Sequence, residues 1–173
     1  VTLAGSAATI VSANDSEIVV IAVQASNSTG DVVLVSNTGA TAVESSAWEY
    51  LVEGVAVSTT PSSGQVGTQV TISGTSLRGG GSQVVAVSLI DVGVTEITSE
   101  NDTHVEVVAA AGPSTLTVGD VILTSDSGAV VTGENIFTYS VPGLITFIDP
   151  TSGQRDTEVT ITGNAICGGG TNI

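Results

Sequence analysis

The chain repeats itself at a spacing of 89 residues. Four blocks of sequence recur with this same offset, and self-similarity at a fixed period indicates that each period folds as one unit. The sequence therefore predicts an array of like modules. The matching blocks are residues 61–74 (PSSGQVGTQVTISG) with 150–163 (PTSGQRDTEVTITG), 30–40 (GDVVLVSNTGA) with 119–129 (GDVILTSDSGA), 48–50 (WEY) with 137–139 (FTY), and 79–81 with 168–170 (GGG in both).

This period divides the chain into one complete repeat and two partial ones. Residues 52–139 form the complete repeat, residues 1–51 correspond to the later part of a repeat, and residues 140–173 correspond to the first part of another. Linkers are expected near 51–54 and 140–143. Because short linkers leave adjacent modules little freedom, a rod-like array is predicted.

The complete repeat has the pattern of an antiparallel β-sandwich. Hydrophobic residues make up 41% of the chain but aromatic residues only 3%, so the core must consist mainly of Val, Ile, Leu and Ala. β-branched residues favour strands, and turn signals recur throughout the repeat. Its length is close to that of an immunoglobulin-like sandwich. Seven strands are predicted: Val55–Thr60, Gln69–Ser73, Gln83–Ile90, Val94–Thr98, His104–Ala109, Asp120–Thr124 and Asn135–Ser140.

In the two longest copies of the repeat, the few large aromatic rings fall on the last strand. Trp48 and Tyr50 occupy the same positions as Phe137 and Tyr139. An aromatic ligand platform is one interpretation of this strand. Packing in the core is favoured, because few other large side chains are present to fill the sandwich.

The spacing of Pro61, Gly64, Gly67 and Gly74 around the segment Val-Thr-Ile resembles the opening of IPT/TIG domains. The later Gly-Asp-Val block and the closing aromatic strand resemble their end, so the likeness covers the chain as one full and two partial domains. Asp156 stands at the position of Gly67, which puts the geometry of that turn in question. The resemblance implies tandem all-β, immunoglobulin-like sandwiches with a period of about 89 residues.

The resemblance also bears on function. IPT/TIG domains occur in receptor ectodomains, bacterial and eukaryotic surface proteins, carbohydrate-active enzymes and some transcription factors. The family has no catalytic residues to carry over to this chain. Its DNA-binding members use basic loops, and no such loop is present here.

The charge balance excludes several classes of partner. The chain has 17 acidic residues, Arg78 and Arg155 as its two basic ones, and a formal net charge of −15. Such a surface repels phosphate backbones and lacks a basic patch for anionic lipid, so no nucleic-acid partner is expected. No apolar run reaches the length of a membrane span, so no membrane insertion is expected. A Lys-free, acidic, Ser/Thr-rich chain without an evident signal peptide predicts a mature or internal segment of an extracellular or cell-surface protein.

No residues form a pattern typical of catalysis, so the chain is not predicted to be an enzyme. His104 is the one histidine and is expected at a strand edge. No metal site and no cofactor is predicted. The turns at 15–17 and 100–102 leave Ca²⁺ as a weak alternative, although they lack the dense acidic spacing of a dedicated loop. Cys167 has no partner within the chain, and burial and an intermolecular bond both stay open.

Several polar turns are candidates for covalent glycans. Asn-x-Ser/Thr sequons occur at Asn14, Asn27 and Asn101. Asn14 and Asn101 occupy the same place in consecutive repeats, which favours N-linked sugar at this pair. Ser/Thr runs beside proline suggest O-linked sugar. The residues concerned are Thr59, Thr60 and Ser62, with neighbouring Ser63, and residues 113–115.

These features favour a structural role. The chain is predicted to be a repeat unit of an extracellular, glycosylated filament or cell-surface stalk. An adhesin or receptor ectodomain that binds a protein or glycan is the alternative, and an accessory domain of a carbohydrate-active enzyme is a weaker one. The partners expected are the chain itself and its glycans.

Self-association is expected because Ile173 corresponds to Val84 and Val1 to Val87. The chain thus spans nearly two periods, which predicts one unit of a longer periodic polymer. Residues 140–173 would complete a sandwich with the equivalent of 1–51 in the next unit, within one long chain or, less favoured, by strand exchange. Residues 157–163 are expected to pair with the neighbour's counterpart of 32–35 or 46–50. The assembly residues are Val1, Leu3, Thr157, Val159, Ile161 and Ile173.

Overall fold

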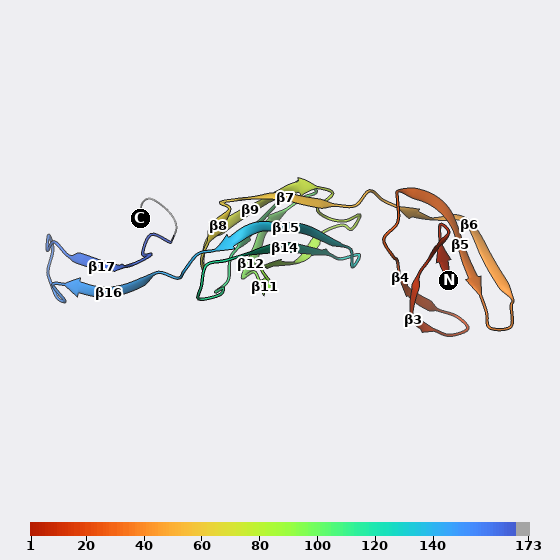
Figure 1. The fold of residues 1–173 in the computed structure, drawn as a ribbon, viewed down its shortest axis with the longest axis horizontal. Coiled ribbons are helices and arrows are strands. Elements are labelled where there is room, and N and C mark those ends of the chain that lie inside the picture. The colour runs from red at the N-terminus through yellow and green to blue at the C-terminus, as the bar shows by residue number, and fades with distance from the viewer. Residues whose placement is uncertain (169–173) are drawn as a thin grey trace. The chain divides into compact units, whose positions relative to one another are not determined.

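The computed structural model describes residues 1–168, and all its regular structure is β-strand (Figure 1). The all-β, immunoglobulin-like fold predicted from the sequence is confirmed. No helix that could span a membrane occurs among the residues described. The chain forms two compact units, which divide between Val52 and Glu53. Residues 51–54 and 140–143, where linkers were expected, lie outside the strands.

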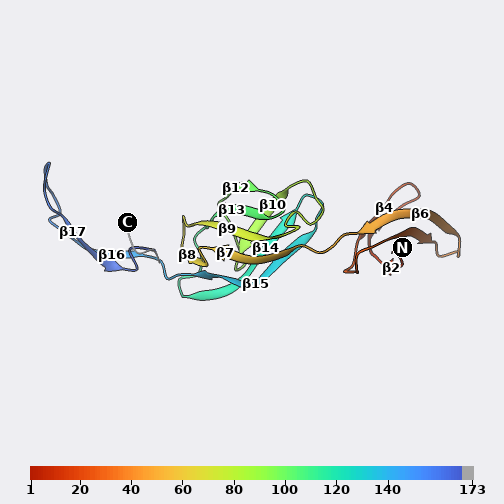
Figure 2. The ribbon, with the colours of Figure 1, turned by 90° about the horizontal axis from the view of Figure 1, so that it is seen from above.

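The complete module, residues 55–139, consists of two sheets. The first sheet has the order β12-β13-β9-β7, and Figure 2 shows these strands following one another across the module. The second sheet has the order β11-β10-β14-β15-β8, in which the short β8 runs parallel to β15. The strands are β7 (Val55–Thr60), β8 (Ser63–Gly64), β9 (Gln69–Thr75), β10 (Val84–Leu89), β11 (Val92–Gly93), β12 (Glu96–Glu100), β13 (His104–Val108), β14 (Thr117–Ser125) and β15 (Val130–Tyr139).

The seven predicted strands are present, and β8 and β11 are additional. The largest difference is in β15, which was expected to begin only at Asn135. Asn135 has a left-handed φ of 54°, and its N–H donates to Asp120 Oδ1 at 2.8 Å. The pairing of β14 with β15 shifts register between Gly119 and Val121. The strand therefore continues through a bulge that the local sequence signals as a turn.

The core of the module lies between the inward faces of its two sheets. Ile72, Leu89 and Leu123 have no exposed surface, and their aliphatic neighbours are almost as deeply buried. Phe137 and Tyr139 are buried with them, with ring centroids 5.3 Å apart and planes at 87°. Burial raises the pKa of Tyr139. The aromatic pair thus packs in the core, as expected from the scarcity of other large side chains.

The first unit, within residues 1–52, reproduces the later part of this module. The order β2-β1-β5-β6 matches β11-β10-β14-β15, and the pair β3–β4 matches β12–β13. The register of Gly30 with Trp48 likewise matches that of Gly119 with Phe137. The strands are β1 (Thr2–Leu3), β2 (Ser6–Ala7), β3 (Thr9–Ala13), β4 (Ile18–Ile21), β5 (Ser28–Val35) and β6 (Thr41–Tyr50).

A hairpin of β16 (Leu144–Asp149) and β17 (Thr160–Asn164) reproduces the pair β7–β9. Leu144 pairs with Asn164, as Val55 pairs with Thr75. The same corner, including a cis proline at 61 and at 150, follows the first strand of each hairpin.

Asp156 does not alter the turn that leads into β17. Its φ of 67° is left-handed, like the 84° of Gly67. The N–H of the following threonine donates to a glutamine carbonyl at 3.1 Å in both turns, from Thr157 to Gln154 and from Thr68 to Gln65. Aspartate tolerates this backbone region better than most residues, which explains how the turn is kept.

Gly112 tests the packing around the aromatic pair. A Cβ at this position would overlap the ring of Tyr139, so Gly112→Ala should destabilise the module by about 1–3 kcal/mol through overpacking. Gly93→Ala is the matched control, because no atom lies within 4 Å of its Cβ position. Urea unfolding of both variants measures the effect. Equal midpoints for the two variants would contradict the assigned packing.

Candidate functional site

The hairpin β16–β17 presents an uncovered aliphatic face. Ile145, Ile148, Val159 and Ile161 are between 42% and 56% exposed. Residues at the same positions of the complete module are at most 6% exposed, because the second sheet covers them. The face therefore consists of positions that are buried in the core of the complete module but exposed in the hairpin. The corresponding buried residues are Ala56, Thr59, Val70 and Ile72.

The first unit carries a hollow of ≈ 330 Å³ at the positions of the module core. Leu3, Val20 and Leu34 line it, and their counterparts Leu89, Val107 and Leu123 are at most 1% exposed. In the complete module, β9 and Leu77 contribute to the core around these positions. The full lining is Val1, Leu3, Asn14, Asp15, Ser16, Glu17, Ile18, Val20, Val32 and Leu34.

The residues predicted for assembly fall into different environments. Val159 and Ile161 are exposed on the hairpin, and Val1 lies half-buried in the hollow. Leu3 is only 5% exposed; it lies on β1, which pairs with β5 inside the first unit, and it lines the hollow. Thr157 is half-buried and uses Oγ1 to accept the N–H of Gln154 at 2.9 Å. Ile173 lies outside the described residues.

A charge pair that sequence reasoning missed joins the two sheets of the module. Arg78 Nε donates to Glu100 Oε2, and Nη2 donates to Oε1, each at 2.9 Å. Glu100 Oε2 also accepts the N–H of Val84 at 3.2 Å. The hydrogen bond from Arg78 lowers the pKa of Glu100. The pair connects the end of β12 to the start of β10. In the sequence, the signal available for this pair was that Arg78 is one of the few basic residues.

This pair also removes oxygen ligands from the turn at 100–102 that was considered for Ca²⁺. The Glu100 carboxylate serves Arg78, and Asp102 Oδ1 accepts the N–H of Arg78 at 3.2 Å. Within residues 1–168, no three His, Cys, Asp or Glu side chains are grouped to hold a metal ion. His104 is exposed at the start of β13, with Nδ1 3.0 Å from Thr103 Oγ1.

The paired sequons form the same turn. Asn101 Oδ1 accepts the N–H of Thr103, the hydroxyl of Thr103 and the N–H of His104 at 2.8–2.9 Å. Asn14 makes the corresponding three bonds to Ser16 and Glu17 at the same range of distances. Both asparagines are exposed. These Asx turns account for the asparagines structurally, and they also place each sequon on the surface.

The remaining glycan candidates differ in accessibility. Asn27, Thr60 and Ser62 are exposed. Thr59 is 6% exposed, and its hydroxyl donates to the carbonyl of Ile136 at 2.6 Å. The expectation of an O-linked sugar at Thr59 is corrected, because this hydroxyl points into the space between the sheets.

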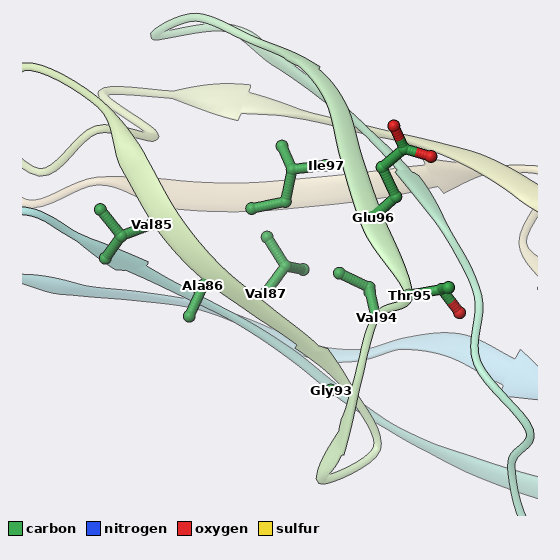
Figure 3. A pocket seen from close by; sticks show the side chains of 8 residues that line it. All are labelled: Val85, Ala86, Val87, Gly93, Val94, Thr95, Glu96 and Ile97. Carbon is green, nitrogen blue, oxygen red and sulfur yellow. The ribbon is translucent and has the colours of Figure 1, made fainter.

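A second hollow, of ≈ 380 Å³, lies beside the edge strands of the complete module. Figure 3 shows Val87, Val94 and Ile97 gathered between the strands, with the Glu96 carboxylate directed away. Its lining contains no aromatic ring and no pair of convergent polar groups. Ligand pockets usually combine apolar walls with such groups, so this hollow does not define a binding site. The other lining residues are Val85, Ala86, Gly93 and Thr95.

The comparison with protein families agrees with this architecture. The model of the IPT/TIG domain matches residues 55–139, the complete module. Residues 55–139 are therefore an IPT/TIG domain. No curated protein is similar to it in sequence.

Solved structures with similar folds belong to longer proteins. An auxiliary nutrient binding protein from Bacteroides ovatus is 20% identical, with a TM-score of 0.42, over 55% of this chain and 22% of that one. The protein SGBP-B from a mixed-linkage glucan utilization locus of the same species, solved with a heptasaccharide, is 15% identical with a TM-score of 0.41, over 84% and 38%. Gamma-CGTase from alkalophilic Bacillus clarkii is 19% identical with a TM-score of 0.42, over 71% and 19%. The chain spans about a fifth to two fifths of these proteins.

Removal of Arg78 tests the charge pair. Arg78→Gln should lower the unfolding midpoint at neutral pH, because Glu100 loses its partner. A carboxylate with a lowered pKa stabilises the fold above its ordinary pKa and loses that contribution as pH falls through the lowered value. The difference from the parent should therefore shrink in acid.

Arg155→Gln is the control, with the same change in charge at a side chain that is 94% exposed. Thermal unfolding followed from neutral to acidic pH measures both variants. A constant difference between Arg78→Gln and the parent across this range would contradict the assigned linkage.

Proposed function

We propose that this chain is a structural segment of an extracellular stalk or filament built from IPT/TIG modules. The proposal rests on one observation, which is that the same strand arrangement recurs along the chain. The first unit and the hairpin β16–β17 keep the strand pairing and bulges of the complete module. Repetition of a module extends length while each module contacts its neighbours, which suits a spacer.

Three further features are consistent with a structural role rather than ligand binding. The aromatic rings of the complete module are in its core, so they offer no platform on which a sugar could stack. The hollow of Figure 3 has aliphatic walls without convergent polar groups. A net charge of −15 also favours solubility and disfavours contact with other acidic surfaces.

Localisation on the source cells tests this function. Antibodies raised against residues 53–139 should label extracellular filaments or stalks along their length in immunogold electron microscopy. Preimmune serum is the control. Labelling confined to the cell interior would overturn the proposal. Labelling only at the tips of appendages would favour the adhesin alternative.

The turns at Asn14 and Asn101 should carry N-linked sugar in protein isolated from the source. Thr103→Ala should remove one glycan mass, because it destroys the sequon and leaves Asn101 in place. Thr103→Ser keeps the sequon and should keep the mass. Intact-mass spectrometry measures both variants. A parent mass equal to that of its bare polypeptide would contradict glycosylation.

A further inference from the structure

We propose that the hairpin β16–β17 of one molecule docks into the hollow of the first unit of a second molecule. The occupant is residues 144–167, and the acceptor is residues 1–52 of the second copy. Together they would form a composite module with the architecture of residues 55–139. This inference deepens the proposed structural function, because it names the contact through which segments associate.

The complete module supplies the register of this contact. There β9 pairs with β13, with Ile72 opposite Val105 and Val70 opposite Val107. The same positions in the docked pair place Ile161 opposite Ile18 and Val159 opposite Val20. The partner of residues 157–163 is thus β4, and not the strands at 32–35 or 46–50, since β9 pairs with neither β14 nor β15.

The hollow matches the hairpin in the chemistry of its walls. Ile18, Val20 and Leu34 line the hollow, and Val159, Ile161 and Ile166 occupy the positions of the residues that fill the module core. Exposed aliphatic surface on both partners would be removed from water on docking. Burial of this apolar surface is the driving force of the association.

The donors and acceptors of two backbone hydrogen bonds in the module also have counterparts in the docked pair. The N–H groups of Gly74 and Leu77 donate to the carbonyls of Thr103 and Asp102, each at 3.0 Å. In the docked pair, Gly163 and Ile166 supply the equivalent donors. The equivalent acceptors belong to residues 15 and 16, which line the hollow.

At positions that contact one another in the module, the hairpin and the first unit both carry residues different from those of the module. Arg78 and Glu100 form an ion pair in the module, and the equivalent positions of the hairpin and the first unit are Cys167 and Ala13. An isolated guanidinium or carboxylate would be costly at such a contact, and neither is left in the composite module.

A second contact shows the same reciprocity in volume. Thr59 contacts Ile136 in the module, through the hydrogen bond to its carbonyl. The equivalents are Ile148 on the hairpin and Ala47 on the first unit. In the docked pair the larger side chain therefore belongs to the hairpin, and no hydroxyl at this position donates to the Ala47 carbonyl.

One position fits less well. Glu44 stands at the position of Gly133, where a Cβ would lie 2.7 Å from the carbonyl oxygen of Ala56. The equivalent backbone of β16 must shift slightly to admit Glu44. Glu44→Gly should therefore tighten the association.

Donor and acceptor are different surfaces, so the contact is heterologous. Such contacts generate open chains unless the rotation closes a ring. A molecule with both surfaces intact should therefore form oligomers that lengthen with concentration. A molecule with one surface disabled should end a chain.

Complementing variants of the full chain test the proposal. Ile161→Asp disables the hairpin and Ile18→Asp disables the hollow, because each places a charge at a position whose counterpart is fully buried. Each variant alone should remain a monomer in sedimentation velocity, with self-association weakened on the order of 100-fold. An equimolar mixture should form a 1:1 dimer, since each variant retains the surface that the other lacks.

The controls carry charge on the outward faces of the same strands. Val19→Glu introduces the residue that the module has at Glu106, and Phe147→Asp alters a position whose counterpart Ser58 is exposed. Both controls should oligomerise like the parent. A parent that stays monomeric at all concentrations, or a mixture that forms no dimer, would overturn the proposal.

Cross-linking gives a readout that does not depend on the folding of Ile18→Asp. Thr160→Cys and Val19→Cys, combined with Cys167→Ser, occupy positions equivalent to the paired residues Thr71 and Glu106. Oxidation should produce a ladder of covalent oligomers. Val11→Cys in place of Val19→Cys should not, because β12, the counterpart of β3, does not pair with β9.

The two proposals fail independently. Self-association of the purified chain without filament labelling on cells would leave the docking contact intact and remove the stalk function. Filament labelling without self-association would do the reverse. A ladder from the Val11→Cys chain equal to that from the Val19→Cys chain would overturn the register.

Discussion

The fold depends on two sheets of aliphatic side chains burying one another. With few aromatic rings available, each valine, isoleucine or leucine contributes modestly, and stability requires that nearly all of them be enclosed. In the complete module this condition is met, because β7, β9 and β13 supply one wall and β10, β14 and β15 supply the other. The first unit has only the later strands and the hairpin only the earlier ones. Their exposed faces are the direct result of that division.

The sequence predicted much of this architecture because alternation and turn residues are local signals. The strands and the aromatic core were accessible in this way, and the family through a resemblance in the spacing of Pro61, Gly64, Gly67 and Gly74. The bulge at Asn135 was not, because a left-handed asparagine in the middle of a strand has the same local signature as a turn. Its N–H is satisfied by Asp120, a residue whose proximity depends on strand pairing.

The candidate sites were less accessible than the fold, for the same reason. The burial of Thr59 and the pairing of Arg78 with Glu100 each depend on contacts between strands far apart in the sequence. Leu3, a predicted assembly residue, lies on β1, whose pairing with β5 within its own unit is likewise not visible in the local sequence. The direction of a side chain relative to the core decides such cases, and a single residue of register reverses it.

The charge pair at Arg78 has a consequence for how neighbouring modules are kept apart during folding. Adjacent repeats of similar sequence are prone to exchange equivalent strands, since each can fold onto the wrong neighbour. If the hairpin β16–β17 took the place of β7 and β9 in the complete module, Cys167 would stand where Arg78 does, and Glu100 would keep a partly enclosed carboxylate with no cation beside it. That mismatch penalises the wrong pairing without adding any attraction to the right one. Arg78 and Cys167 thus distinguish two segments whose hairpins are otherwise similar.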